Sequence, residues 1–283
     1  MKFIIVLLFF LFPLDANARI LFQDPTGKAL NEAYEGFSES SLKSLKGADL
    51  GAKEYLLGLL YLNGDKEFDV EKSCKKSVSL LSKAWDSGVV DAGYSLATLY
   101  YKGACVEKDI KKARALAEKT AEEGYLLSQR MVGRAYWGRE WGDLFPKNMD
   151  KAIYWLGRAG GSGDSQSAGN LSYIYRGGHG VPKNEKKSFC WISKAAFSKF
   201  EKDDFGVSFS LFAKYFENGI GTDVDLVKAY KYYDLGGSAG VEGKQRVAKK
   251  MTQEQIDEAI RQSQEWQKEH NVQVGGGFIR RAN

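Results

Sequence analysis

Aromatic and glycine positions return along this chain with a period close to 40 residues. An aromatic residue stands at positions 61, 100, 136, 175 and 216, at intervals of 39, 36, 39 and 41 residues. A glycine follows three residues later in four of the five cases, and in the third it stands at Gly138. Self-similarity at such a period is typical of stacked supersecondary units that bury their apolar faces against one another.

The second half of each period carries a helical pattern of bulky and small residues. The bulky positions are Leu80, Leu116, Trp155, Trp191 and Tyr232, and the small ones are Ala84, Thr120, Ala159, Ala195 and Gly236. A spacing of four residues places both types on one face of a helix, and the small residues allow a neighbouring helix to approach closely. Each period therefore predicts a pair of antiparallel helices.

Residues suited to helix ends separate the two predicted helices of a period. Glycine is favoured after the first helix because the residue there adopts a positive φ, and Asp or Asn can cap the second helix. The predicted end glycines are Gly64, Gly103, Gly178 and Gly219, and the predicted N-caps are Asp109, Asn184 and Asp225.

These patterns predict an all-α fold, a right-handed α-solenoid of about five helical-hairpin repeats with terminal caps. The repeats are expected over 49–240, as units 49–88, 91–124, 127–163, 164–200 and 205–240. An N-terminal cap is expected over 19–48 and C-terminal capping helices over 241–270, where Thr252 and Gln255 fit a capping box. Residues 271–283 are expected to form a flexible tail.

The repeats resemble a known family. The stretch from Asp91 to Gly103, the segment Val181-Pro182-Lys183-Asn184 and the turn Gly219-Ile220-Gly221 are similar to the Sel1-like repeat, a relative of the tetratricopeptide repeat. The resemblance implies a helical solenoid whose first helices line a concave, partner-binding face.

The first 18 residues have the order of a secretory signal peptide. Lys2 precedes an apolar run from Phe3 to Phe12, and Ala16-Asn17-Ala18 matches a small-residue cleavage site. We expect the mature chain to begin at Arg19 and to act in a bacterial periplasm, with a membrane anchor as the alternative. No later segment is long and apolar enough for stable membrane insertion.

Charge and cysteine content narrow the function classes. The chain has 283 residues with 41 basic and 36 acidic side chains, a net charge of +5 that does not indicate nucleic-acid binding. Cys74 and Cys105 would lie in adjacent repeats and are a candidate disulfide, although sequence does not fix connectivity. Cys190 is expected to be a buried thiol.

Catalytic motifs are not found. The two histidines, His179 and His270, stand outside zinc-binding helix motifs, and no nucleophile-elbow or phosphate-binding motif occurs. The stretch 161–164 falls on a repeat end, and the acidic positions near Asp223 fail the calcium-loop pattern. We expect no catalytic residue, no metal and no cofactor.

A partner-binding surface is predicted from side chains that the repeat pattern does not need. Trp, Tyr and Arg dominate interface hot spots, and the irregular loop 137–146 carries three large aromatic residues. Such a loop should be covered by a partner, with Trp137, Arg134 and Arg176 as anchors. The predicted partner-binding residues are Tyr101, Arg130, Arg134, Trp137, Trp141, Phe145, Tyr173, Arg176 and Lys214.

The resemblance extends to function. Exported Sel1-like proteins include immunity proteins that neutralise lipase or phospholipase effectors of type VI secretion, and this chain is similar in size, export signal and repeat number. The resemblance thus implies a non-enzymatic scaffold that binds and occludes another protein. Two alternatives stay open: an envelope regulator or assembly scaffold, and a hydrolase of penicillin-like compounds.

Overall fold

The computed structural model of the chain describes residues 18–35, 50–66, 68–200, 206–275 and 278–281. These residues form two compact units. One contains Ala29–Tyr125 together with the N-terminal residues up to Gln23, and the other contains Leu126–Asn283 together with Asp24–Lys28. The predicted signal peptide lies outside the described residues except for Ala18, and residues 36–48 of the predicted N-terminal cap lie outside them as well.

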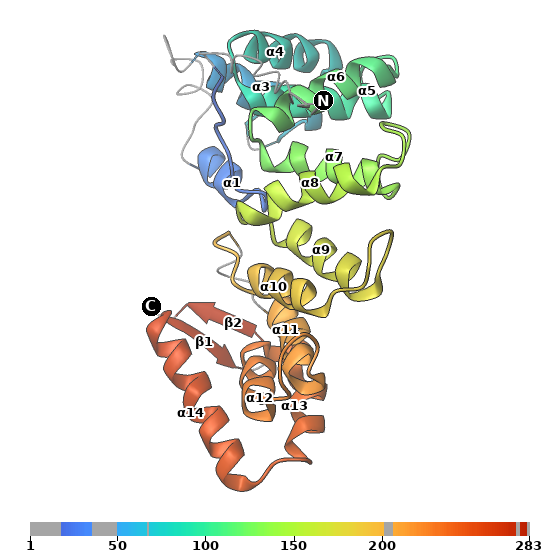
Figure 1. Ribbon diagram of the computed structural model, residues 1–283. Coiled ribbons are helices and arrows are strands. Elements are labelled where there is room, and N and C mark those ends of the chain that lie inside the picture. The colour runs from blue at the N-terminus through green and yellow to red at the C-terminus, as the bar shows by residue number, and fades with distance from the viewer. Residues whose placement is uncertain (1–17, 36–49, 67, 201–205, 276–277, 282–283) are drawn as a thin grey trace, which may run out of the picture. The chain divides into compact units, whose positions relative to one another are not determined.

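The first unit is built from two helical hairpins (Figure 1). Its helices are α1 (Lys28–Glu35, of which Lys28 belongs to the second unit), α3 (Leu50–Asn63), α4 (Cys74–Asp86), α5 (Val90–Lys102) and α6 (Ile110–Glu122). The buried side chains of Leu56, Leu81 and Leu96 lie in its core. Helix α4 packs on both α3 and α5, so each hairpin covers the apolar face of the next, as the repeat pattern predicts.

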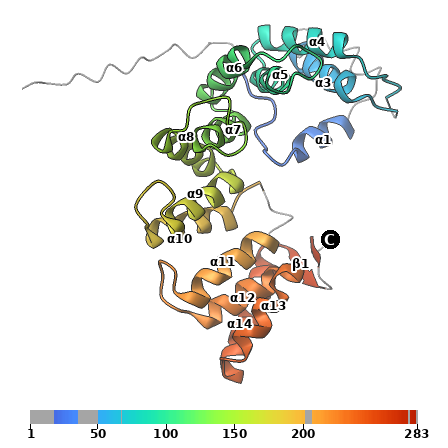
Figure 2. The ribbon, with the colours of Figure 1, turned by 90° about the vertical axis from the view of Figure 1, so that its right-hand side faces the viewer.

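The second unit continues the repeat with three hairpins and then changes (Figures 1 and 2). The hairpin helices are α7 (Leu126–Trp137), α8 (Met149–Gly161), α9 (Ser165–Gly177), α10 (Glu185–Ala196), α11 (Gly206–Asn218) and α12 (Leu226–Leu235). A 3-10 helix (Gly237–Gly240), α13 (Val241–Ala248), α14 (Gln253–Glu269), β1 (Val272–Gly275) and β2 (Phe278–Arg281) follow. The all-α repeat architecture is therefore confirmed.

A recurring cap joins the two helices of every hairpin. The side chain of the N-cap residue accepts a hydrogen bond from the backbone of the lysine three positions later, over 2.8 to 3.4 Å. The ammonium group of that same lysine lies 4.7 to 5.5 Å from the ring of the repeat aromatic. One lysine thus donates its backbone N–H to the helix cap and places its ammonium group over the aromatic ring. This double role helps to explain why the aromatic residue and the N-cap recur together in each repeat. The N-cap and lysine pairs are Ser73–Lys76, Asp109–Lys112, Asn148–Lys151, Asn184–Lys187 and Asp225–Lys228.

The N-terminal residues of the first unit are held as an extended segment. Arg19 forms a parallel β-bridge with Val89. The backbone N–H groups of Leu21 and Phe22 donate to the two carboxylate oxygens of Asp91 over 2.8 and 2.9 Å. Asp91 is fully buried, so its charge depends on these two bonds for compensation.

The C-terminal residues depart from the predicted flexible tail. Thr252 and Gln255 form the predicted capping box at the start of α14. Beyond α14, strands β1 and β2 pair as an antiparallel hairpin with Val272 opposite Arg281. Val272 is buried in the core, and the Val274 backbone N–H donates to the side chain of Gln267 over 2.8 Å. The described residues of the predicted tail therefore include two paired strands.

Candidate protein-binding surface

An aromatic contact marks the surface where helices α7 and α9 meet. The rings of Trp137, the last residue of α7, and Tyr173 on α9 lie 6.1 Å apart. The ring of His179 also stacks on Tyr173, with centroids 4.4 Å apart. Tyr173 is nevertheless 50% exposed. We call the surface formed by Arg134, Trp137, Asn170, Tyr173 and Arg176 the α7–α9 surface.

Local backbone geometry brings His179 to this surface. Helix α9 ends at Gly177, and Gly178 adopts a φ of +68°, which reverses the chain. The backbone N–H of His179 then donates to the carbonyl of Ile174 over 3.1 Å. The turn therefore folds the imidazole back onto Tyr173, a contact that helical periodicity alone does not reveal.

Cationic side chains contact aromatic rings of the second unit. The guanidinium of Arg139 lies 4.8 Å from the Trp137 ring, and that of Arg176 lies 5.9 Å from the ring of Tyr215. Arg134 pairs with Glu140 at 3.0 Å, and Lys214 is exposed on α11. The surface thus combines aromatic and basic groups, which are enriched at protein–protein hot spots.

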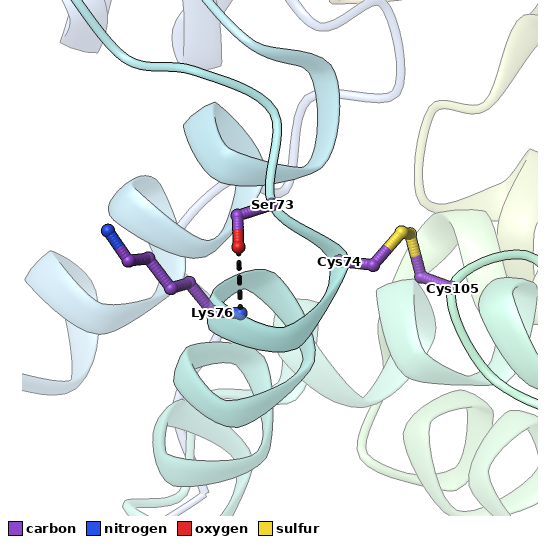
Figure 3. The surroundings of a disulfide bond; sticks show 4 residues. All are labelled: Ser73, Cys74, Lys76 and Cys105. Carbon is purple, nitrogen blue, oxygen red and sulfur yellow. Dashed lines mark hydrogen bonds between the residues drawn. A yellow bond between two sulfur atoms is a disulfide. The ribbon is translucent and has the colours of Figure 1, made fainter.

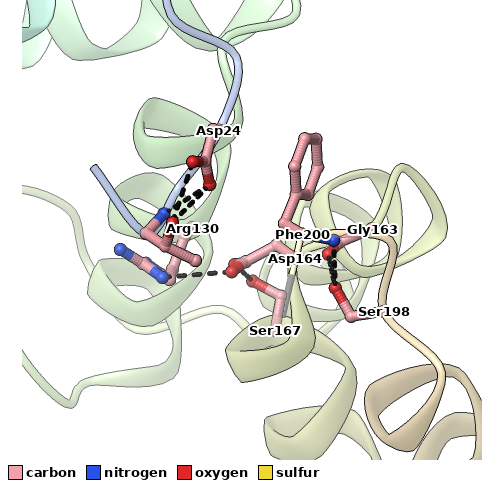
Figure 4. A network of polar contacts seen from close by, with 8 residues as sticks. Asp24, Arg130, Gly163, Asp164, Ser167, Ser198 and Phe200 are labelled. Atoms are coloured by element: carbon pink, nitrogen blue, oxygen red, sulfur yellow. Dashed lines mark hydrogen bonds and ion pairs between the residues drawn. The ribbon is translucent and has the colours of Figure 1, made fainter. Parts of the chain in front are cut away.

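A cavity of about 580 Å³ opens in the same unit, beside the first turns of α7 and α9. Arg130 lies in its wall and donates to the carboxylate of Asp164 over 3.0 Å, while the Ser167 hydroxyl donates to the other oxygen over 2.6 Å (Figure 4). Pro25, Thr26 and Lys28 from the N-terminal segment also line it. The Arg130–Asp164 pair ties α7 to the start of α9 and so fixes the position of the α7–α9 surface.

The predicted partner-binding residues differ in their exposure and in the unit to which they belong. Tyr173, Arg176 and Lys214 are exposed in the second unit, and Arg134 is half-buried at the α7–α9 surface. Tyr101 belongs to the first unit, where Lys108 lies 5.6 Å from its ring.

The expectation that the loop aromatics await a partner is wrong for two of the three. Phe145 is 3% exposed and stacks on Tyr136 at 4.5 Å, and Trp137 is 9% exposed. Trp141 adopts a φ of +65° in a turn and is half-buried. The loop folds back on its own hairpin, so its apolar groups are removed from water without a partner.

Two residues outside the predicted set contribute to this surface. His179 stands outside any zinc-binding motif, yet its ring stacks on Tyr173. Arg139 belongs to the irregular loop, yet its guanidinium lies over the Trp137 ring. The sequence feature that indicates both residues is local composition, because basic and aromatic residues cluster around the ends of α7 and α9.

The cysteines fall into one pair and one thiol. Cys74 begins α4 and Cys105 follows α5, and the structure joins them as a disulfide with Cα atoms 4.9 Å apart (Figure 3). Cys190 is exposed, so the expectation of a buried thiol is wrong. It lies on α10 at a helical position that faces solvent, whereas Ser188 and Ile192 on the same helix are buried.

Shifted pKa values in the fold have structural causes. Burial raises the pKa of Asp91, and the bonds from Leu21 and Phe22 partly oppose that shift. Hydrogen bonds from Arg246 hold the pKa of Glu217 below its usual range.

Within the part of the chain that the structure describes, no group of three or more His, Cys, Asp or Glu side chains could hold a metal ion. None of the described helices has the length and apolarity to cross a membrane.

The repeats match a known protein family. The Sel1 repeat family model matches more than half of the chain, over residues 54–89, 90–125, 126–164, 165–196 and 210–241. A curated relative, chitin synthase regulatory factor 3 of Schizosaccharomyces pombe, is 27% identical over 204 residues. That alignment covers 69% of this chain but only 21% of the relative, so the chain spans about a fifth of its length.

Two solved structures share the fold. A protective antigen of uropathogenic Escherichia coli matches with a TM-score of 0.60 at 26% identity, covering 78% of this chain and 46% of that one. A Sel1 repeat protein from Oxalobacter formigenes matches with a TM-score of 0.63 at 22% identity, covering 83% and 98%. With five matched repeats and the hairpin architecture described above, this chain belongs to the Sel1 repeat family.

Proposed function

We propose that this Sel1 repeat protein is an interaction scaffold whose α7–α9 surface binds a partner protein, and that the partner is a secreted antibacterial effector of the lipase or phospholipase type. The observation that carries the binding role is Tyr173. Its ring lies between Trp137 and His179 yet is 50% exposed, so a rigid aromatic group is presented to solvent. Pre-organised aromatic side chains lose little entropy on binding and are typical hot spots.

The surroundings of Tyr173 favour binding over a purely structural role. Trp137 is 9% exposed and its ring lies 6.1 Å from the ring of Tyr173, while Arg176 is exposed one turn further along α9. Neither exposed side chain is needed to fill the core of the unit. Truncation of either should therefore weaken partner binding by about 2 kcal/mol, close to a thirtyfold loss in affinity.

Occlusion requires only a tight interface. An effector is silenced if its active-site entrance is covered, and a typical stable complex buries about 800 Å² on each partner. Successive repeat hairpins can supply such an area without any catalytic group. The role of an immunity protein therefore fits a scaffold of this architecture.

The disulfide supports export to an oxidising compartment. Structural disulfides persist in the periplasm and are rare in the cytosol. The Cys74–Cys105 bond therefore agrees with the predicted signal peptide and with a periplasmic site of action. An effector that acts on lipids from the periplasmic side would meet the protein there.

The immunity role predicts protection that depends on both export and the α7–α9 surface. Where a lipase or phospholipase effector is encoded beside this gene, cells that direct that effector to their periplasm should survive when the full-length protein is co-expressed. Deletion of residues 2–18, or the pair Tyr173→Ala and Arg176→Ala, should reduce colony counts by about 100-fold or more.

The matched control is the pair Tyr154→Ala and Arg158→Ala on α8. Tyr154 is 56% exposed and Arg158 lies 6.0 Å from its ring, so a similar tyrosine–arginine pair is removed from α8, the second helix of the preceding hairpin. Protection should persist in this variant. Protection without the signal peptide, or equal loss in both double variants, would count against the proposed role.

A regulatory scaffold is the second candidate. Similarity to chitin synthase regulatory factor 3 favours it, because that protein is named as a regulator of an enzyme. In that case the same surface would hold an enzyme of envelope synthesis. Partner capture from envelope extract, with identification of the bound protein, separates a regulated enzyme from a toxic effector.

A further inference from the structure

The cavity beside α7 and α9 has the size and the wall of a binding pocket. Its volume is about 580 Å³, and clefts that bury a ligand typically enclose about 300 to 1,000 Å³ with mostly apolar walls. The apolar part of its wall is formed by Ile192 and Ala195 on α10, Phe200 after α10 and Leu211 on α11. Leu211 is 44% exposed, so a large apolar side chain at the cavity is left in contact with water. A ligand that covers it would gain from its burial.

The aromatic part of the wall is held in place by hydrogen bonds (Figure 4). The backbone N–H of Phe200 donates to the Ser198 hydroxyl over 3.3 Å. That hydroxyl donates in turn to the carbonyl of Gly163 over 2.6 Å, in the turn before α9. The backbone that carries the Phe200 ring is therefore tied to the start of α9. A wall that is already formed lowers the entropy cost of binding.

The charged groups in the wall favour an uncharged ligand. Arg130 donates to one oxygen of Asp164, the Ser167 hydroxyl donates to the other, and Asp164 is almost fully buried. An anion at Arg130 would also meet the Asp164 carboxylate, and a cation would meet the guanidinium, so neither finds a free counter-charge. Lys28 also lines the cavity, but it is exposed, and the attraction of a hydrated charge is weak.

One face of α9 connects the cavity to the α7–α9 surface. Gln166 and Gly169 line the cavity, and Tyr173 stands four residues after Gly169. Residues three or four positions apart share a helix face, and four residues rise about 6 Å along the axis. Two residues of an extended chain span about 7 Å and place their side chains on the same side. An extended segment that covers Tyr173 with one side chain can therefore place another in the cavity.

Glycine at position 169 leaves room between the cavity and Tyr173. A methyl group added at Gly169 would meet no atom within 4 Å, so the space in front of this residue is open. Glycine is unfavourable inside a helix, and neither a positive φ nor close packing requires it here. The exposed carboxamide of Gln166, one turn earlier, can donate to or accept from the main chain of a bound segment.

We propose that this cavity receives an uncharged apolar side chain of the partner, carried on an extended segment two residues from the side chain that covers Tyr173. The inference rests on the proposed protein-binding function and adds to it a second anchor and the chemistry of the group that fills it. Leu211 and Phe200 contact the inserted group, and Gly169 leaves the space for it. Anchors that fill pre-formed pockets are typical hot spots.

The test uses a neutral apolar probe and a substitution that fills the cavity. Prodan, a neutral naphthalene dye, is titrated with the mature protein, and its emission should shift to the blue and saturate. Gly169→Leu should weaken dye binding by about tenfold or more, because the leucine side chain occupies volume that the dye needs. N-acetylphenylalaninamide at millimolar concentration should displace the dye, and N-acetylserinamide should not.

Gly157→Leu on α8 is the matched control. A methyl group at Gly157 would also meet nothing within 4 Å, but Gly157 is not among the described residues that line the cavity. Its affinity for the dye should stay within about twofold of the wild type, after a thermal melt has shown that both variants are folded. Equal dye binding by Gly169→Leu and the wild type, or no saturable binding by the wild type, would overturn the proposal.

Protection in cells separates this inference from the proposed function. Gly169→Leu should lose protection as the pair Tyr173→Ala and Arg176→Ala does, whereas Gly157→Leu should protect. Full protection by Gly169→Leu, with loss in the double variant, would remove the cavity from the interface and leave the proposed function standing. If the wild type does not protect, the proposed function fails, and the dye titration alone decides whether the cavity binds an apolar group.

Discussion

Replacing Cys74 by Ser is expected to lower the free energy of unfolding of the first unit by about 3 to 4 kcal/mol. The bond closes a loop between residues 31 positions apart, and the chain entropy of a loop of that length corresponds to this range. The two cysteines join the start of α4 to the turn after α5, so the bond clamps two adjacent hairpins. Loss of the disulfide should therefore destabilise both hairpins.

Urea denaturation of the oxidised protein followed by circular dichroism measures the effect. The wild type in reductant should unfold at the same urea concentration as Cys74→Ser, and Cys190→Ser should remain within about 0.5 kcal/mol of the wild type, because Cys190 is exposed and unpaired with another cysteine. A Cys74→Ser variant as stable as the oxidised wild type would show that the bond does not stabilise the hairpins.

Gly133→Ala is expected to destabilise the second unit by about 1 to 3 kcal/mol, the usual result of overpacking. A methyl group on Gly133 would lie 2.8 Å from Cγ and 3.0 Å from the backbone nitrogen of Leu156, which is fully buried on α8. Backbone cannot move aside as a side-chain tip can, so α7 must shift.

Gly157→Ala is the matched substitution and should have the opposite sign. Gly157 lies within α8 (Met149–Gly161), and a methyl group there would meet nothing within 4 Å. Replacing a helical glycine with alanine at an open position stabilises by about 0.5 to 1 kcal/mol. Urea denaturation of both variants compares them directly. The explanation by close helix packing fails if Gly133→Ala is as stable as Gly157→Ala.

The hairpin repeats could be predicted because each helix end depends on local chemistry. Asp109 caps α6 and Asn184 caps α10 as expected, and Gly103 and Gly178 adopt the positive φ that ends α5 and α9. A cap involves residues three or four positions apart, so a single repeat unit contains the whole interaction. The Ser73 and Asn148 caps complete the same pattern.

The fate of the irregular loop could not be predicted from composition. An apolar side chain in a long loop can be buried by its own hairpin or by a partner, and both cases have the same sequence pattern. Here Leu144 and Phe145 fold inward, helped by the turn at Trp141, whose carbonyl accepts from the Leu144 backbone over 2.8 Å. Long-range packing, which no local spacing encodes, decided the outcome.

Contacts near the two termini also could not be predicted from local sequence patterns. Asp91 reads as an ordinary residue in the first turn of a helix, but its carboxylate binds the backbone of Leu21 and Phe22, about 70 residues earlier in the chain. The glycines after Val274 predict a flexible tail, but Val272–Gly275 pairs with Phe278–Arg281 as antiparallel strands. In both cases the contacting residue lies too far along the chain for a local sequence pattern to predict the contact.

Photo-crosslinking in living cells tests the central claim most directly. A benzoylphenylalanine residue placed at Tyr173 should form a covalent adduct with one partner protein, visible as a shifted band and identified by mass spectrometry. The same residue at Tyr154 on α8, which is 56% exposed against 50% for Tyr173, should form none with that partner. An adduct at position 154 but not at 173 would contradict the assignment of partner binding to the α7–α9 surface.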